Sequence, residues 1–247
     1  APALKAANVS MVDQSAADVA REVADIVLLK NDLRVIVDGI REGRKTFANT
    51  LKYIRATLIS NFGNFYAVAI GSLMISFLPM LPKQLLLLNL LSDFPMMAIA
   101  YDRVSDEEVA RPQRYDFRSL YIMFITLGLV STVFDFIYFA LFYRISPEVL
   151  QTNWFIASVI TELLLLASIR SLLPIGKAGW PAPLIVLLSA VAFALTLALP
   201  IIPWTADFFE FIRPTSAHLV LIVSLAFLYL GVSEFVKRLL VRALNLP

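Results

Sequence analysis

The fold of this chain is decided by residues 56–100, which read ATLISNFGNFYAVAIGSLMISFLPMLPKQLLLLNLLSDFPMMAIA. The segment contains two apolar runs, 56–78 and 84–100, and Pro79 and Pro82 mark the turn between them. Each run is long enough to cross a hydrocarbon core of about 30 Å as a helix. We therefore expect two consecutive membrane-spanning helices in this segment.

Four further apolar runs follow along the chain, at residues 118–143, 153–173, 182–199 and 216–236. Of the 247 residues, 59% are hydrophobic and 16% are charged, and the mean hydropathy is +0.77. These values lie outside the usual composition of a soluble domain. The chain has no Cys, which excludes disulfides, thiolate metal sites and cysteine nucleophiles. It begins without an initiator Met or a signal-peptide pattern, so we expect a longer parent protein.

The N-terminal part has a different character from the rest. It predicts a polar helix at about 15–24 and a short strand at 25–29. A helical pattern then runs without proline from Leu33 to Pro79, a length of roughly 65 Å, so its first half must stand outside the bilayer. The predicted fold is mainly α, a six-helix transmembrane bundle with a small α/β part. The expected regions are 1–32 (α/β), 33–55 (stalk helix) and 56–247 (transmembrane).

The distribution of positive charge predicts the orientation. If the N-terminal region is cytosolic and the spans alternate, all but three of the 21 Lys and Arg residues fall on the cytosolic side. The three exceptions are Lys83, Arg144 and Arg213. We therefore expect a multi-pass protein of the cell membrane with both termini in the cytosol. Three tryptophans are expected at segment ends, in the membrane interface: Trp154, Trp180 and Trp204.

Polar groups inside the apolar runs are costly, which makes them candidates for function. The first run carries Thr57, Asn61 and Asn64 at helical spacing. The second carries Asn89, Ser92 and Asp93 at helical spacing. Carboxylate, amide and hydroxyl oxygens suit a hard cation, and a single carboxylate favours Mg²⁺ over Ca²⁺. The alternative for the two asparagines of the first run is that they form hydrogen bonds between helices.

Pro95 follows these polar residues of the second run. Proline has no amide hydrogen and clashes with the carbonyl of Leu91, one turn back. We therefore expect the second helix to lose regular hydrogen bonding near residues 93–96. Backbone carbonyls freed there would face the same place as the Asp93 side chain.

Four other titratable residues lie in or beside the predicted spans. Asp135 and Glu162 lie within the third and fourth spans, where each is either a proton-bearing or secondary ion group or a neutral acid hydrogen-bonded between helices. Glu234 is expected to form an ion pair with Lys237 and Arg238. His218 lies near the start of the last span and is expected at the surface.

Several stretches together resemble the P-type cation-transporting ATPases, with a match over essentially the whole chain. Residues 1–8 (APALKAAN) are similar to the stretch after the family's Gly-Asp-Gly-x-Asn-Asp motif. Residues 18–29 (DVAREVADIVLL) and 39–44 (GIREGR) with Asn49 resemble the last phosphorylation-domain elements and the stalk of transmembrane helix five. Residues 60–64 (SNFGN) and 89–93 (NLLSD) look like the ion-binding motifs of helices five and six. Asn64, with 77–81 (FLPML) and 152–155 (TNWF), resembles the magnesium-translocating branch.

This resemblance implies the function. Asn64 and Asp93 are the implied cation ligands, with Asn89 beside them, and Mg²⁺ is the implied transported ion. Residues 1–32 are implied to be the end of a cytosolic phosphorylation domain, and the membrane is implied to be a bacterial or archaeal plasma membrane. The phosphorylated Asp-Lys-Thr-Gly-Thr sequence and a nucleotide-binding domain do not occur, so no catalytic or cofactor-binding residue is assigned and this stretch alone is not expected to hydrolyse ATP.

The expected partners are the lipid bilayer, a divalent cation and the missing N-terminal portion of the same pump, with no nucleic acid. The alternative function is a free-standing cation or proton-coupled carrier that uses Asp93, Asp135 and Glu162 as a relay. The soluble N-terminal residues discriminate between the two, because a carrier has no use for a strand and helix that cannot complete a sheet.

Overall fold

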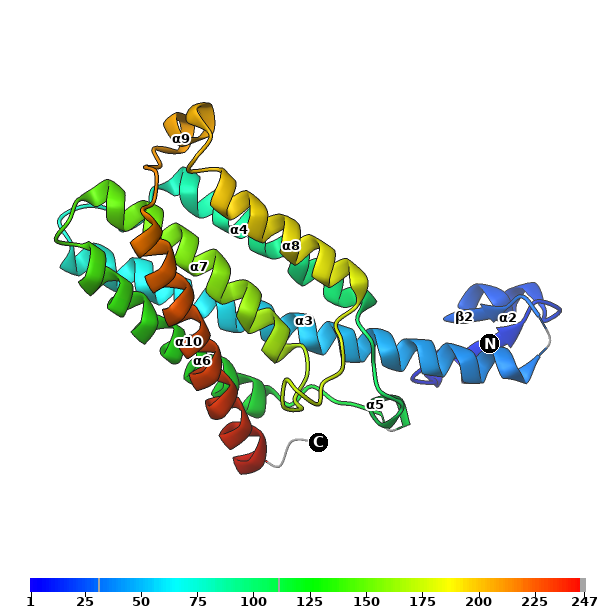
Figure 1. Ribbon diagram of the computed structural model, residues 1–247. Coiled ribbons are helices and arrows are strands. Elements are labelled where there is room, and N and C mark those ends of the chain that lie inside the picture. Colours follow the sequence, from blue (N-terminus) through cyan, green and yellow to red (C-terminus); the bar gives the residue numbers. More distant parts are fainter. Residues whose placement is uncertain (31, 111, 245–247) are drawn as a thin grey trace. The chain divides into compact units, whose positions relative to one another are not determined.

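The structure is a computed structural model that describes residues 1–30, 32–110 and 112–244, and it divides the chain into two compact units (Figure 1). Unit 1 comprises Ala1–Phe47 and Ser105–Gln113, and unit 2 comprises Ala48–Val104 and Arg114–Pro247. The long helix α3, Leu33–Met74, contributes residues to both. It confirms the predicted helical pattern from Leu33 and ends a few residues before Pro79.

Unit 1 contains a small α/β element. Its helices are α1 (Pro2–Ala6), α2 (Asp18–Val23) and α5 (Asp106–Ala110), and its strands are β1 (Met11–Asp13) and β2 (Ile26–Leu28). The strands pair in parallel, with Met11 opposite Ile26. The Asp25 carboxylate accepts a hydrogen bond of 2.8 Å from the Ser10 amide, which lowers the pKa of that carboxyl. The predicted helix at 15–24 and strand at 25–29 are confirmed in shortened form.

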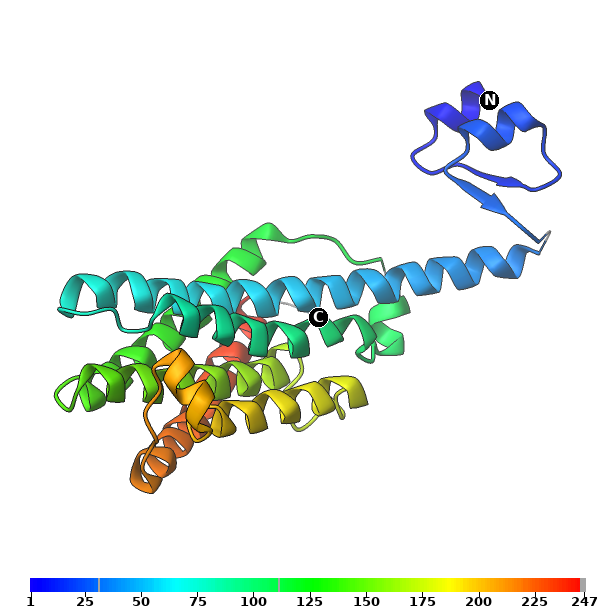
Figure 2. The ribbon, with the colours of Figure 1, turned by 90° about the horizontal axis from the view of Figure 1, so that it is seen from above.

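Unit 2 is an all-helical bundle. Besides the later part of α3 it contains α4 (Pro82–Met97), the 3₁₀ helix η1 (Ala98–Tyr101), α6 (Phe117–Phe142), α7 (Pro147–Ile169), α8 (Pro183–Ala198), α9 (Pro203–Phe209) and α10 (Ser216–Ala243). In Figure 2, α4 and α8 can be followed along the bundle, with α9 at one end of α8. Among the residues that the structure describes, four helices are long and apolar enough to span a membrane, or five if the bent pair α8 and α9 forms one span.

Helix α7 is the centre of unit 2. It packs against α4, α6, α8 and α10, and every residue from Leu150 to Glu162 is buried. Its N-terminus is capped by the Ser146 hydroxyl, which accepts a hydrogen bond from the Val149 amide, and Pro147 occupies the first turn. The helix therefore begins well before residue 153, where the apolar run begins. A span predicted from apolar composition misses such a polar first turn.

Two sequence expectations about this bundle are wrong. Trp154 does not lie at a segment end in the interface, because it sits inside α7 with 1% of its surface exposed. Helix α4 does not lose its regular structure at residues 93–96, because it continues through Pro95 to Met97 before the 3₁₀ turn begins. The fixed φ of proline fits a helix, and the helix here continues at the cost of one backbone hydrogen bond.

Helices α3 and α6 approach each other closely at two glycines. A Cβ atom added at Gly63 would lie 2.7 Å from the Ser131 Cβ atom, and one added at Gly128 would lie 2.4 Å from a ring carbon of Phe62. Both distances are shorter than van der Waals contact. These glycines therefore set the spacing of the helix that carries Asn64 against α6.

Candidate functional site

The candidate site centres on the Glu162 carboxyl group of α7. Glu162 is 6% exposed, and its Oε1 atom accepts a hydrogen bond from the side-chain amide of Asn64 on α3. Its Oε2 atom is also buried, and no group in the described part of the chain forms a hydrogen bond with it. A buried carboxyl oxygen without a partner is unusual, because burial removes its hydration. It is therefore an atom to which a ligand can bind.

Two hydroxyl groups and a second acid surround this carboxyl. The side chains of Ser60 on α3 and Ser92 on α4 lie against Glu162, and both serines are buried. The Ser92 hydroxyl also donates to the carbonyl oxygen of Leu88, at 3.1 Å. Asp93 lies near enough to act electrostatically on Glu162. We call the set Ser60, Asn64, Ser92, Asp93 and Glu162 the α3–α4–α7 cluster.

The sequence-predicted ligands have different places in this arrangement. Asn64 is half-buried, and its side-chain amide donates a hydrogen bond to Glu162 and so has Glu162 as its carboxylate partner. Asn89 is half-buried on α4, and its role as a ligand stays a prediction. Asp93 is on an exposed face of α4, so its direct contact with Asn64 also stays a prediction. Asn61 is exposed on α3.

Sequence reasoning left Glu162 open and did not assign Ser60 and Ser92 as ligands. A sequence signal existed for the serines, because Ser60 precedes Asn64 by four residues and Ser92 follows Asn89 by three, so each shares a helix face with an assigned residue. Glu162 had no such signal. Its place beside Asn64 depends on how α7 is rotated within the bundle.

The chemistry of the cluster is that of a hard-cation site with few charges. Within residues 1–30, 32–110 and 112–244, no three His, Cys, Asp or Glu side chains gather as metal ligands. The cluster instead offers two carboxyl groups with an amide and hydroxyl oxygens. Mg²⁺ keeps several of its waters and needs only one or two carboxylates, whereas Ca²⁺ prefers six to eight oxygen ligands.

The exposed face of α4 beside Asp93 carries large apolar side chains. Leu86, Leu90, Phe94 and Met97 are between 51% and 71% exposed. Their spacing places them on one side of the helix. A carboxylate on a helix face in contact with hydrocarbon costs several kcal/mol, by the order of magnitude measured for membrane insertion. Asp93 is therefore placed for contact with another protein surface or with water, and not with lipid.

A second buried acid lies on the α6 side of α7. The Trp154 indole N–H donates a 2.8 Å hydrogen bond to Oδ1 of Asp135, which is 4% exposed. The Oδ2 atom has no hydrogen-bond partner among the described residues. Asp135 also interacts electrostatically with Glu162. The sequence left its role open. The structure confirms a hydrogen bond between helices at this acid.

Buried charges also gather around Asp102, just after η1. Arg170 Nη1 lies 3.2 and 3.1 Å from the two Asp102 carboxylate oxygens, and Lys52 Nζ lies 3.5 Å from Oδ2. The Asn49 side-chain amide donates to the carbonyl oxygen of Asp102, at 3.0 Å. All four side chains are buried. This Asp102 cluster ties α3, the segment after η1 and the end of α7 together.

The last helix is held to the end of α7 by hydrogen bonds between Ser168 and an ion pair that lies within α10. Glu234 pairs with Lys237 at 2.8 Å and with Arg238 at 3.3 Å, which confirms the expected pairing. Lys237 also donates to the carbonyl oxygen of Ser168, at 2.8 Å. His218, expected at the surface, is half-buried, with Nδ1 3.3 Å from the Asn153 side-chain amide.

Comparison with known proteins identifies the family. Residues 77–239 match the family described as "Cation transporting ATPase, C-terminus". The chain is 36% identical over 247 residues to a "Magnesium-transporting ATPase, P-type 1" of Escherichia coli K12, a match that covers 96% of this chain and 27% of the relative. It is 40% identical over 201 residues to a protein of the same description from Salmonella typhimurium 14028s, covering 77% and 22%.

A relative with a different printed ion is more distant. The "Calcium-transporting ATPase" of Bacillus subtilis 168 is 30% identical over 181 residues, covering 69% of this chain and 20% of the relative. The chain spans about a quarter of the length of the magnesium-transporting relatives that it matches. The family region overlaps most of unit 2, and the match to the Escherichia coli protein, which covers 96% of the chain, extends into unit 1 as well. The chain therefore belongs to the P-type cation-transporting ATPases, and residues 77–239 correspond to their C-terminal region.

Proposed function

We propose that this chain is the ion-carrying membrane part of an ATP-driven pump and that Mg²⁺ is the transported ion. The observation that carries the proposal is the buried Oε2 atom of Glu162, which lies beside the amide of Asn64 and has no hydrogen-bond partner within residues 1–30, 32–110 and 112–244. The choice of ion is supported by the printed names of the relatives at 36% and 40% identity and by the small number of carboxylates in the cluster.

The proposed ligands are Asn64, Asn89 and Asp93, as the sequence predicted, together with Glu162. Asn64 would turn its amide oxygen to the ion and keep its N–H group on Glu162, which fixes the orientation of both side chains. The Ser60 and Ser92 hydroxyls would hold waters of a partly hydrated ion. With Asp93 and Glu162 both ionised, the two negative charges balance one divalent cation.

The exposed face of α4 supports a pump that is completed by further protein. Asp93, Leu86 and Phe94 would be covered by membrane helices from the rest of the full-length protein, which would also enclose the cation. The aspartyl phosphate would form in that part as well, so the present chain would bind the ion without hydrolysing ATP. Movements would reach the cluster along α3, which is helical from Leu33 to Met74 and carries both Ser60 and Asn64.

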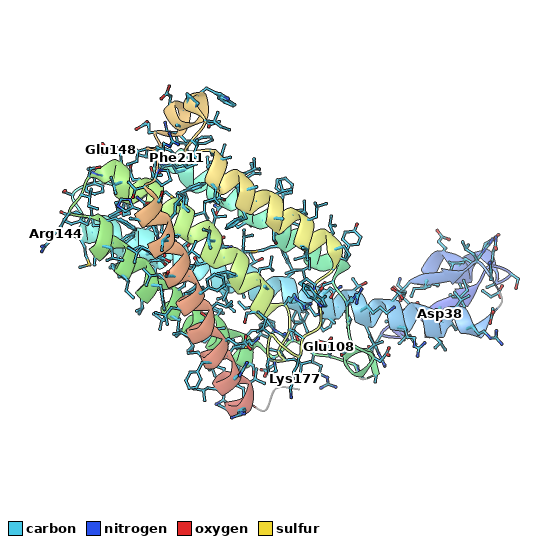
Figure 3. The ribbon with its side chains drawn as sticks, viewed as in Figure 1. Asp38, Glu108, Arg144, Glu148, Lys177 and Phe211 are labelled. Atoms are coloured by element: carbon cyan, nitrogen blue, oxygen red, sulfur yellow. The ribbon has the colours of Figure 1, made fainter. Side chains whose placement is uncertain are left out.

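Six spans with cytosolic termini remain the proposed topology, with residues 1–32 as the end of a phosphorylation domain and 33–55 as the stalk. Length and composition identify four or five spans, and the later part of α3 would be a further one. Asn61 and Asn64 lower the mean hydropathy of that part of α3, which would explain why composition does not select it. Arg144 lies at the Glu148 and Phe211 end of unit 2, and Lys177 lies toward the other end (Figure 3). Lys83 forms an ion pair with Glu210, the residue before Phe211, and so belongs to the same end as Arg144. Lys83 and Arg144 are two of the three positive residues expected outside the cytosol, so this grouping supports an outer end with few positive charges.

The test uses the full-length protein in proteoliposomes, with ATP hydrolysis measured against Mg²⁺ concentration. Glu162→Gln removes the charge without changing the side-chain shape, and its apparent Mg²⁺ affinity is expected to fall by at least about tenfold. Asp93→Asn is expected to act in the same direction. The control is Glu148→Gln, the same change at an exposed position in the first turn of α7, which should leave the affinity unchanged. An unaltered Mg²⁺ dependence in Glu162→Gln would remove that carboxylate from the site.

A further inference from the structure

Several buried hydroxyl groups in the helices of unit 2 bond within their own helix. A serine or threonine side chain in a helix can donate to the carbonyl oxygen one turn back, so this partner is close at hand at every helical position. Bonds of this kind, 2.7–2.9 Å long, are formed by Thr132, Thr161 and Thr196. A buried hydroxyl that lacks such a bond therefore marks a place where a different partner fits.

Two buried hydroxyls beside the α3–α4–α7 cluster depart from this pattern. Ser158 of α7 is 2% exposed, and its hydroxyl forms no hydrogen bond with any described residue. The hydroxyl of Thr57 on α3 is also buried and has no partner in the same part of the chain. Ser158 precedes Glu162 by four residues and Thr57 precedes Ser60 by three, so each shares a helix face with a member of the cluster. Each is an oxygen that water or a hydrated ion can bond.

Helices α3 and α7 run in opposite directions through unit 2. Where α7 begins, the side-chain amide of Gln151 donates a 2.8 Å hydrogen bond to the carbonyl oxygen of Leu78, which follows α3. Where α7 ends, Arg170 pairs with Asp102, which also pairs with Lys52 from the earlier part of α3. The start of α7 therefore lies at the same end of unit 2 as the end of α3.

This arrangement places the two hydroxyls on opposite sides of the cluster. Ser158 lies one turn before Glu162 and is therefore displaced toward the end of unit 2 where α7 begins. Thr57 lies about two turns before Asn64 and is displaced toward the Asp102 cluster, at the other end. In the proposed topology the first end is the outer one and the second is cytosolic.

A spacing of one helical turn suits a partly hydrated divalent cation. Mg²⁺ binds oxygen at about 2.1 Å, and its bound waters donate hydrogen bonds of about 2.8 Å, so a hydroxyl about 5 Å from the ion can accept from one of these waters. One turn of a helix rises about 5.4 Å. A cation that contacts Glu162 can therefore keep one of its waters bonded to Ser158.

We propose that Ser158 and Thr57 are the steps next to the cluster on an ion pathway through unit 2, with Ser158 on the outer side and Thr57 on the cytosolic side. Each hydroxyl accepts a hydrogen bond from a water of the hydrated cation as the ion passes between the cluster and that side of the membrane. Both hydroxyls are buried, so each side opens only when helices move during the ATP cycle. This inference rests on the proposed function and its topology.

The first test is the accessibility of a cysteine at each position in the full-length pump, freed of any other cysteine. A cationic, membrane-impermeant methanethiosulfonate reagent is added to one side of sealed vesicles during ATP turnover, with vesicles of both orientations. Ser158→Cys should be modified from the outer side only and Thr57→Cys from the cytosolic side only, each at least about tenfold faster than the control Thr196→Cys. Thr196 is buried in α8, and its hydroxyl donates to the Ala192 carbonyl of its own helix.

The outcomes separate this inference from the proposed function. Modification of both cysteines from the same side, or no faster than Thr196→Cys, would overturn the pathway. If this happens while Glu162→Gln loses Mg²⁺ affinity, the pathway is refuted and the proposed function stands. If Glu162→Gln keeps the wild-type affinity while the modification is sided as expected, the proposed site fails and the pathway stands without it.

A second test needs no cysteine and decides the inference if a cysteine variant does not fold. Thr57→Val keeps the side-chain shape without the hydroxyl, so the maximal rate of Mg²⁺-stimulated ATP hydrolysis should fall about fivefold, the factor that corresponds to one hydrogen bond. Ser158→Ala should act in the same direction, and Thr57→Ser, which keeps the oxygen, should retain the wild-type rate. Equal rates in Thr57→Val and Thr196→Val would contradict the pathway. A loss that Thr57→Ser does not restore would also overturn it, because packing and not the hydroxyl would then be responsible.

Discussion

The Asp102 cluster allows a sharp prediction about stability, through the variant Arg170→Ala. Arg170 contacts both carboxylate oxygens of Asp102, at 3.2 and 3.1 Å, and it also donates to the carbonyl oxygens of Ala178 and Gly179. The side-chain exposures are 4% for Arg170 and 0% for Asp102. Removing the guanidinium leaves Asp102 with Lys52, 3.5 Å from Oδ2, and the Ala182 amide.

The magnitude follows from burial. Breaking a buried ion pair by removing one partner costs about 3–5 kcal/mol, because the remaining charge stays buried. For chains of about 150–250 residues, a loss of 1 kcal/mol lowers the unfolding temperature by roughly 2–4 °C. Arg170→Ala is therefore expected to lower the unfolding temperature by roughly 6–20 °C.

The assay is thermal unfolding of the purified chain in detergent, followed by circular dichroism. The matched control is Arg238→Ala, which also removes an arginine from an ion pair. The Arg238 side chain is 49% exposed, however, and such a pair contributes about 0–1 kcal/mol. If Arg170→Ala destabilises the chain no more than Arg238→Ala does, the Asp102 cluster is not what holds α7 to the segment after η1.

Two further predictions concern packing and pH. Gly128→Ala should destabilise the bundle by about 1–3 kcal/mol in denaturant unfolding, because its Cβ atom would lie 2.4 Å from the Phe62 ring, whereas Gly231→Ala has open space and should not. The Asp25 carboxyl, whose pKa the Ser10 amide lowers, stabilises unit 1 above its unfolded pKa of about 4 and loses this effect as pH falls through its lower folded pKa. The protection factor of the Ser10 amide, which compares its exchange rate with the intrinsic rate at the same pH, should therefore fall in acid. Asp25→Asn should abolish this pH dependence, and a protection factor that does not change with pH in the unaltered protein would contradict the reasoning.

Much of the fold was predictable because its signals are local. The apolar runs gave α4, α6 and α8 within a few residues, and the proline-free pattern gave α3. The error at the start of α7 has a physical cause. Gln151, Thr152 and Asn153 are polar and yet buried, because α7 lies at the centre of unit 2 and its polar residues face protein. A hydropathy window averages the apolar character of a segment, so it does not detect a helix turn whose polar residues are buried against protein.

The candidate site was predictable only in part for a related reason. Polar residues within an apolar run are visible in the sequence, so Asn64, Asn89 and Asp93 could be selected from it. Which carboxylate meets Asn64 depends on the rotation of α7 against α3, a property of the packed bundle. Glu162 was visible as an intramembrane acid, but its partner was not. Pro95 predicted a helix break, but α4 continues through it to Met97.

Locating the bound ion in the full-length pump would show whether Glu162 binds it. Mn²⁺ can replace Mg²⁺ in crystals of the full-length pump, where its anomalous scattering marks its position. We expect one Mn²⁺ ion that contacts Glu162 Oε2 directly or through one water molecule, at an oxygen distance of about 2.1 Å where the contact is direct. Mn²⁺ bound elsewhere in the membrane, with Glu162 still bonded to Asn64 and its Oε2 atom without a ligand, would contradict it.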